Sequence, residues 1–281
     1  MKSKLSHLEK SLIALCMAIL ATPAAQASGF AATVSPPRFE LFAKPGEILR
    51  ESVEISNSDT GAANFKLRTA DWDLTDDGNV TIHPPELRPG SCRDWTKIER
   101  RKLKLIAQSD RNFRFEIHVP EDVPAGECRV ALLLEGTEDE EVMAGTEEIK
   151  FPVQGRIAII IYVVVGDAMP AMNLHKLTMG KVNSQEIPVV VLENNGNAHG
   201  RPSGVLVGTD AVGNQLEFTV SPSPVMPGQT RRIPIWPAKT NRVAMKDVVM
   251  PLKLSGTIEW EGGKQKIDES VSPTHRIGLT E

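Results

Sequence analysis

The sequence predicts an all-β protein built from two β-sandwich domains. After the first 27 residues helical periodicity is almost absent, whereas short runs rich in β-branched residues recur along the whole chain. Clusters of glycine, proline, asparagine and aspartate interrupt these runs at the spacing expected of turns. Together the two patterns are typical of sheets that pack face to face.

The first 27 residues have the pattern of a secretory signal peptide. Three lysines precede an apolar run over 12–21, and Ala25-Gln26-Ala27 offers a cleavage site between small residues. The apolar run is shorter than the roughly 20 residues that a membrane-spanning helix needs, and no comparable run follows it. We therefore expect a mature chain that starts near Ser28, is exported to the periplasm and does not insert into the membrane.

The first domain is expected over 28–167. About 250 residues follow the signal, which suits two domains of roughly 100 to 150 residues each. About seven strands in this first part match an immunoglobulin-like sandwich. The run Ile157 to Val165 is continuously apolar, which predicts a strand buried inside a sheet. The candidate strands are 33–42, 47–56, 62–71, 112–119, 127–135 and 147–165.

The second domain is expected over 168–281, after a short hinge at 166–170. Its sequence shows the same alternation of β-branched runs and turn residues. Gly262-Gly263 lies between the last two runs and predicts a tight hairpin turn. The candidate strands are 173–182, 187–193, 204–208, 215–220, 231–236, 248–260 and 264–276.

Cys92 and Cys128 are the two cysteines that remain after signal cleavage. An even number of cysteines in an exported chain favours a disulfide bond between them. Two buried thiols in a core are the alternative. Neither cysteine has a CxxC partner or a nearby histidine, so a redox or metal-binding role is not indicated.

No pattern in the sequence indicates an enzyme. The histidines after the signal are scattered without metal-ligand spacing, and no nucleophile elbow or phosphate-binding glycine loop is present. We therefore predict no catalytic residue, no metal and no cofactor. The formal net charge of −4 becomes more negative when the signal and its lysines are removed, which argues against nucleic acid as a partner.

The segment 147–165 carries the clearest indication of a function. In its first half Ile149, Phe151 and Val153 share one face of the expected strand. An edge strand with such an apolar stripe can bind another polypeptide by β-augmentation, in which main-chain hydrogen bonds join the two chains. The alternative is an ordinary edge strand that Pro152 protects against unwanted pairing.

Several segments resemble those of the periplasmic chaperones of the chaperone-usher pathway. This resemblance implies two immunoglobulin-like domains arranged in an L. It also implies that the chain binds secreted pilus or fimbrial subunits by donor-strand complementation and prevents their aggregation before assembly. Whether an outer-membrane usher is a further partner stays open. The segments that carry the resemblance are 35–41, 53–57, 120–129, 193–197 and 225–231.

The same resemblance assigns candidate site residues. In that family an arginine in the cleft and a lysine on the seventh strand bind the terminal carboxylate of the subunit. Arg38 matches the arginine position and Arg156 the lysine position, and a guanidinium can bind a carboxylate through two hydrogen bonds. The apolar stripe of 149–153 matches the strand that is donated to the subunit.

Departures from the family pattern, of which a bridge between Cys92 and Cys128 within the first domain is one, leave a second interpretation open. Pro152 lacks a main-chain donor in the strand that would pair with the subunit, and 161–165 replaces the usual end of the seventh strand. The alternative is a chaperone-like structural or adhesive protein with a fixed protein partner. An enzyme ranks third, because it would need convergent titratable groups in a pocket between the domains.

Overall fold

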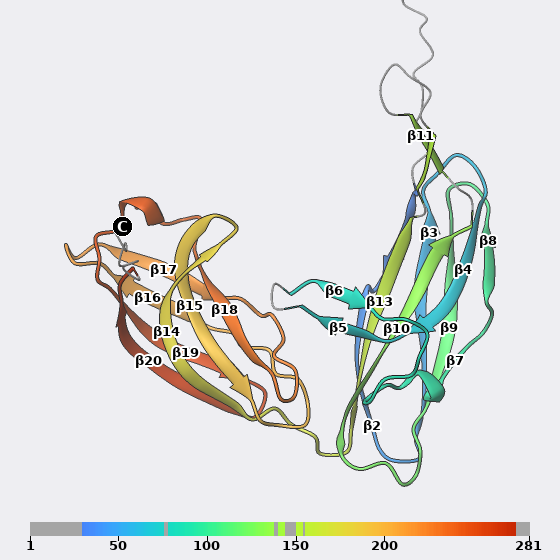
Figure 1. Cartoon of the computed structure of the whole chain (residues 1–281), viewed down its shortest axis with the longest axis horizontal. Coiled ribbons are helices and arrows are strands. Elements are labelled where there is room, and N and C mark those ends of the chain that lie inside the picture. Colours follow the sequence, from blue (N-terminus) through green and yellow to red (C-terminus); the bar gives the residue numbers. More distant parts are fainter. Residues whose placement is uncertain (1–29, 76–77, 138–139, 144–149, 154, 274–281) are drawn as a thin grey trace, which may run out of the picture.

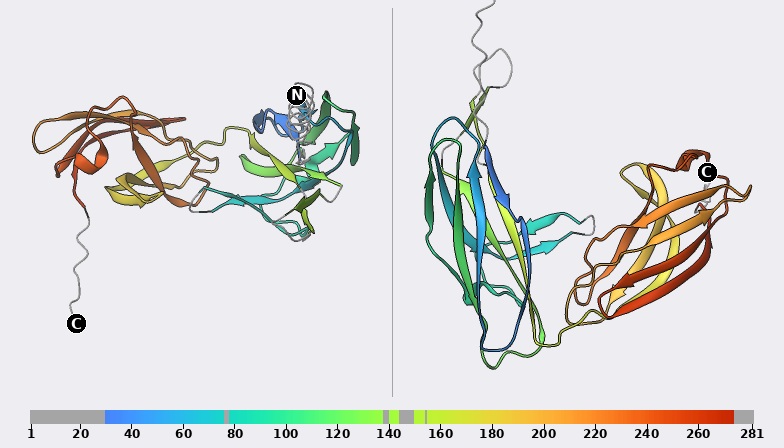
Figure 2. Two further views of the ribbon diagram at one scale, coloured as in Figure 1. Left: turned by 90° about the horizontal axis from the view of Figure 1, so that it is seen from above. Right: turned by 180° about the vertical axis from the view of Figure 1, so that it is seen from behind.

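The computed structural model describes residues 30–75, 78–137, 140–143, 150–153 and 155–273 (Figure 1). The expected signal peptide and Ile149 lie outside these residues. Apart from two short 3₁₀ helices, all regular secondary structure of the described chain is strand, and the strands form two sandwiches that are joined at one end and diverge from it (Figures 1 and 2). The predicted all-β fold class with two β-sandwiches is confirmed.

The first sandwich packs a four-stranded sheet against a five-stranded sheet, in the orders β1-β3-β9-β7 and β2-β13-β10-β4-β8. The core between the sheets contains Val53, Phe115 and Ile161, all buried. The strands of the first sheet are β1 (Ala32–Ser35), β3 (Ile48–Asn57), β9 (Ser109–His118) and β7 (Thr96–Ile98). Those of the second are β2 (Arg38–Ala43), β13 (Arg156–Val165), β10 (Gly126–Gly136), β4 (Ala63–Ala70) and β8 (Lys102–Leu105).

Strand β13 lies inside the five-stranded sheet, antiparallel to β10 and parallel to β2. Ile159 and Ile161 point into the core of the sandwich, whereas Tyr162 and Val164 are buried on the opposite face of the sheet. The predicted burial is confirmed for 159 and 161–165, which explains why this part of the run lacks the usual alternation of apolar and polar residues, whereas Ile157, Ala158 and Ile160 are partly exposed.

A hairpin of β5 (Trp72–Leu74) and β6 (Val80–Ile82) leaves the end of β4 and projects toward the second sandwich (Figures 1 and 2). Trp72 is buried at its base and packs edge-on against Tyr162, with ring centroids 5.1 Å apart. The sequence did not predict this hairpin, because three-residue strands are too short to show a periodicity. The short 3₁₀ helix η1 (Arg93–Trp95) then leads into β7.

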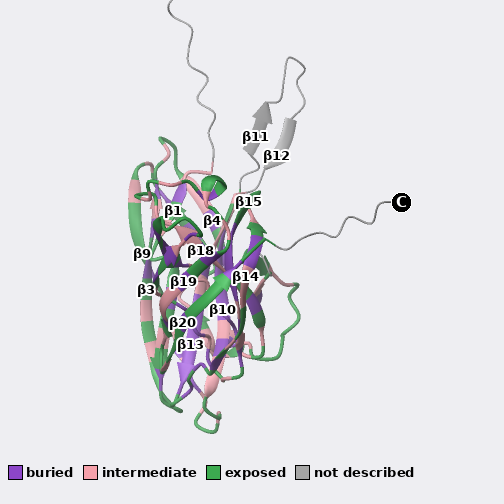
Figure 3. Ribbon diagram, turned by 90° about the vertical axis from the view of Figure 1, so that its left-hand side faces the viewer, coloured by how far each residue is buried: buried purple, intermediate pink, exposed green. Residues whose placement is uncertain are grey.

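The second sandwich is one seven-stranded sheet in the order β14-β15-β18-β17-β16-β19-β20. Its edge strands β14 and β20 contact each other, so the sheet curls around a single apolar core. Figure 3 colours the buried segments of both sandwiches purple. The predicted hairpin between the last two strands is confirmed, but its turn residues are Glu261 and Gly262, because Gly263 already pairs with Trp260. The strands are β14 (Met172–Val182), β15 (Gln185–Asn194), β16 (Val205–Thr209), β17 (Gln215–Val220), β18 (Thr230–Pro237), β19 (Leu252–Trp260) and β20 (Gly263–Val271), with the 3₁₀ helix η2 (Met245–Asp247) before β19.

Polar and aromatic contacts join the two sandwiches. The Glu127 carboxylate accepts a hydrogen bond from the backbone N–H of His199 at 2.8 Å and also contacts the His199 ring. That ring lies against Tyr162, with centroids 4.2 Å apart, and Arg201 donates to Glu40 at 2.8 Å. These contacts tie the second sandwich to the outer face of the five-stranded sheet.

Candidate functional site

The first half of β13 has a main-chain edge that no strand of the described chain pairs with. Its other edge pairs with β10 along its whole length, but β2 begins only at Arg38, opposite Ile160. The N–H of Ile160 donates to the carbonyl of Pro37 at 3.1 Å. Since N–H and C=O groups alternate sides along a strand, those of Arg156 and Ala158 point to the same side, where β2 is absent. This edge can accept a further strand.

Phe30 packs beside the start of this edge. A Cβ added at Gly155 would collide with the Phe30 ring, so only glycine allows this close approach. The Phe30 ring also contacts Phe65 edge-on, with centroids 5.9 Å apart. The chain before β1 therefore lies against the point where β13 begins.

The expected donor residues Phe151 and Val153 lie on β12 (Lys150–Val153), which precedes β13. This strand pairs antiparallel with β11 (Glu140–Met143), with Phe151 opposite Val142. A strand has two edges, and among the described residues no strand pairs with the second edge of β12. Ile149, the third expected donor residue, lies outside the described residues.

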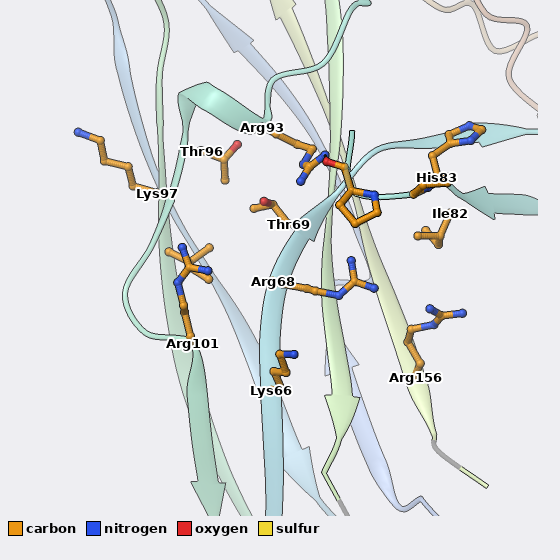
Figure 4. Close-up of a pocket in the computed structure, with 13 residues that line it drawn as sticks. Lys66, Arg68, Thr69, Ile82, His83, Arg93, Thr96, Lys97, Arg101 and Arg156 are labelled. Carbon is orange, nitrogen blue, oxygen red and sulfur yellow. The ribbon is translucent and has the colours of Figure 1, made fainter. Parts of the chain in front are cut away.

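Arg156 lines an open pocket on the outer face of the five-stranded sheet (Figure 4). The pocket has a volume of about 1060 Å³ and none of its lining residues is acidic. Six of them are basic, and they come from β4, the η1 to β8 region and β13 (Figure 4). The basic residues are Lys66, Arg68, Arg93, Lys97, Arg101 and Arg156.

Three of these cations have acidic partners beside the pocket. Arg68 donates to the Glu135 carboxylate from Nε at 3.2 Å and from Nη2 at 2.9 Å. Arg156 Nη1 lies 3.8 Å from the same carboxylate, and Arg93 Nη1 lies 3.3 Å from Asp71. No described acidic residue lies within ion-pair distance of the other three basic residues, so the pocket carries excess positive charge.

The structure does not bring Arg38 and Arg156 together. The residue opposite Arg38 on β13 is Ile160, four positions beyond Arg156, which corresponds to about 13 Å along the strand. The Arg38 side chain pairs with Glu40 at 3.1 Å, within the contacts that join the two sandwiches. Arg156 instead shares its pocket with Arg68, which the sequence analysis did not single out.

The predicted disulfide between Cys92 and Cys128 is confirmed, with Cα atoms 5.5 Å apart. It attaches the segment before η1 to the start of β10, and the backbone N–H of Cys92 also donates to the Arg129 carbonyl. Arg93, the next residue, lines the pocket. The disulfide therefore holds one wall of the pocket against the sheet.

The sequence does contain a pattern of basic residues that indicates part of this pocket. The segment 97–104 reads Lys-Ile-Glu-Arg-Arg-Lys-Leu-Lys, a basic run in a chain with net negative charge. The turn from β7 into β8 brings Arg101 to the pocket that Lys66 also lines, whereas Lys97 lies opposite Glu116 on β9, on the outer face of the four-stranded sheet. That turn joins the two sheets, so local sequence does not reveal what it faces.

Two further observations concern the described residues. They contain no group of three or more His, Cys, Asp and Glu side chains that could hold a metal ion. They also contain no helix of sufficient length and apolar character to cross a membrane.

No protein-family model and no curated protein matches this sequence. Among solved structures, the class 5 fimbriae chaperone CfaA is 13% identical with a TM-score of 0.45, over 86% of this chain and 100% of that chain. A chain of the CsuC–CsuE chaperone-tip adhesion subunit complex from Acinetobacter baumannii is 13% identical with a TM-score of 0.43, over 85% and 97%. The YadV chaperone is 10% identical with a TM-score of 0.42, over 85% and 99%. Chaperones of fimbriae and pili, at low sequence identity, are thus among the solved structures to which this chain is similar.

Proposed function

We propose that the chain is a periplasmic chaperone that binds secreted pilus or fimbrial subunits by donor-strand complementation and prevents their aggregation before assembly at an outer-membrane usher. One observation carries this proposal. The edge of β13 at Arg156 and Ala158 has no partner strand in the described chain, and the Arg156 side chain lines a pocket with excess positive charge.

The subunit binds along this edge and along β12. Main-chain hydrogen bonds to β13 provide affinity without requiring a particular subunit sequence. Ile149, Phe151 and Val153 supply apolar side chains to the core of the incomplete subunit, and each buried apolar Å² contributes about 25 cal/mol. The subunit is thereby shielded until another strand replaces the donated one.

The terminal carboxylate of the subunit binds the guanidinium of Arg156, with Arg68 beside it. A carboxylate can accept two parallel hydrogen bonds from one guanidinium, so these side chains are chemically suited to the role. The incoming carboxylate displaces Glu135, which both arginines now contact. Arg38 remains the second predicted contact.

Affinity purification of the exported chain from its own periplasm tests this function. We expect a small secreted β-subunit to co-purify in about a one-to-one ratio, and the Arg156→Ala variant to recover less of it. Arg50→Ala is the matched control, because Arg50 is an exposed, ion-paired arginine on the opposite sheet. A protein that purifies alone, or equal recovery from all variants, would contradict the proposal.

A second candidate is a chaperone-like structural or adhesive protein with a fixed partner. The observation that favours it is the pairing of β12 with β11, which occupies one edge of the expected donor strand within the same chain. This candidate predicts recovery of the same partner from every preparation, without exchange against added subunits. Exchange of the bound polypeptide would favour the chaperone.

A further inference from the structure

The hairpin of β5 and β6 contacts the second sandwich at its turn. Arg231 on β18 is only 6% exposed, and its Nη2 lies 3.5 Å from the carbonyl oxygen of Thr75. A Cβ added at Gly78 would lie 3.3 Å from the same nitrogen, so the guanidinium fits directly against the turn. Arg231 Nη1 donates to the carbonyl of Pro224 within the second sandwich, which holds the guanidinium in this position.

Met226 of the second sandwich packs near the base of the same hairpin. It is 1% exposed and belongs to a buried cluster with Trp72 of β5 and Tyr162 of β13. The turn that carries it is anchored to its own sandwich, because Asn194 Nδ2 donates to the carbonyl of the preceding Val225 at 2.9 Å. The second sandwich therefore holds the hairpin at two places, its turn and its base.

The end of the hairpin forms a wall of the pocket that contains the proposed carboxylate site. Ile82, the last residue of β6, and the following His83 line this pocket together with Arg68 and Arg156 (Figure 4). Ile82 also packs against the cluster that buries Met226. One hairpin thus joins the second sandwich to the pocket.

The position of this wall affects how strongly the pocket binds an anion. The half-buried Ile82 excludes water from part of the pocket. The attraction between a guanidinium and a carboxylate is stronger where water is excluded. A hairpin that moved away from the sheet would admit water beside Arg68 and Arg156, and the contacts of Met226 and Arg231 oppose such a movement.

We propose that Met226 and Arg231 are positioning residues through which the second sandwich fixes the hairpin wall and sets the affinity of Arg156 and Arg68 for a carboxylate. This inference rests on the proposed function, because the carboxylate is the terminal one of the bound subunit. Coupling between two sites is reciprocal, so a carboxylate in the pocket also strengthens the contact between the hairpin and the second sandwich.

Two forms of one peptide measure this coupling. The probe is a fluorescent peptide of alternating valine and threonine, made with a free terminal carboxylate and with a terminal amide, and titrated with the full exported chain. The unchanged chain should bind the free acid about fivefold more tightly than the amide, as expected for one exposed ion pair. Met226→Ala and Arg231→Gln should each reduce this ratio to less than about twofold and leave binding of the amide unchanged.

Matched variants separate this effect from a general loss of structure. Met226→Leu keeps an apolar side chain of similar size and should keep the ratio of the unchanged chain. Arg232→Gln makes the same change in charge at the next, exposed residue of β18 and should also keep it. Hydrogen exchange of the His83 amide, which donates to the Asp71 carbonyl at 2.9 Å, should be faster in the two test variants only.

Three results overturn the proposal. The first is an unchanged ratio in both test variants, and the second is an equal loss of acid and amide binding, which is what a purely structural role predicts. The third is a ratio of one, or no binding of either form, in the unchanged chain. Subunit capture is measured separately by co-purification and depends on the edge of β13, so failure of this coupling and failure of the chaperone function are distinguishable.

Discussion

Arg68 and Glu135 form an ion pair with two donor atoms across the neighbouring strands β4 and β10, with Arg68 Nη2 2.9 Å from Glu135 Oε1. Both side chains are partly exposed, and the same carboxylate lies near Arg156. In the free protein Glu135 therefore occupies the position that we propose for the terminal carboxylate of the bound subunit.

Replacing Glu135 should accordingly strengthen subunit binding. In Glu135→Gln both arginines lose a competing carboxylate, and we expect affinity for a carboxylate ligand to rise by a factor of about two to five. The measurement is the dissociation constant of a recovered subunit, with Glu116→Gln on the opposite sheet as control. Weaker binding would show that Glu135 positions the arginines and does not compete with the ligand.

The disulfide should contribute strongly to stability. For a sequence separation of 36 residues, the chain-entropy model gives about 4 kcal/mol. We expect Cys92→Ala/Cys128→Ala to lower the free energy of unfolding of the first sandwich by up to that amount, as measured by denaturant titration. Thiol titration of the unfolded, unreduced mature chain should find no free thiol, and two free thiols would contradict the bond.

Tyr162 should report on the junction between the sandwiches, because it is the sole tyrosine of the chain. Burial raises the pKa of Tyr162 above its ordinary 10.0, and the Glu127 carboxylate raises it further, whereas the Arg201 guanidinium opposes the shift. The ultraviolet absorbance of phenolate should therefore appear at higher pH than in the unfolded chain. Arg201→Gln should raise the midpoint further and Glu127→Gln should lower it.

Because the pKa of Tyr162 is raised in the folded protein, the free energy of unfolding also depends on pH. Because the folded protein holds the Tyr162 proton more strongly, the contribution to stability is fully present below about pH 10 and is lost as pH rises through the folded pKa. Alkaline unfolding titrations of the unchanged chain and of Tyr162→Phe measure it. Titration of Tyr162 at the ordinary value in the folded chain would contradict the buried environment.

His199 should limit the movement of one sandwich relative to the other. Its ring contacts both Glu127 and Tyr162 from the opposite side of the junction. We expect His199→Ala to increase the radius of gyration in small-angle X-ray scattering and to leave each core folded. His175→Ala is the control, because the partner of His175 is Glu193 within the second sandwich. Equal scattering profiles would show that the remaining contacts suffice.

Sequence patterns predicted most of the long strands but not the site. The expected strands 33–42 and 147–165 were wrong as single strands, because the first is divided into β1 and β2 and the second into β12 and β13, and in each case the two parts lie in different sheets. The run Ile157 to Val165 and the turn at Gly262 were found because burial and hairpin geometry leave local signals. The relation of Arg38 to Arg156 depends on the register of β2 against β13, which a one-dimensional pattern does not contain. The cations of the pocket come from distant segments, so their convergence required the tertiary fold.

The central claim is that the edge of β13 binds the partner strand, and Ala158→Pro tests it most directly. The N–H of Ala158 points away from β10, so proline removes a donor from the edge and keeps the β10 ladder. The measurement is co-purification of a subunit from the periplasm, with thermal unfolding as the control for folding. We predict a folded variant that recovers no subunit, whereas undiminished recovery by a folded variant would contradict the account.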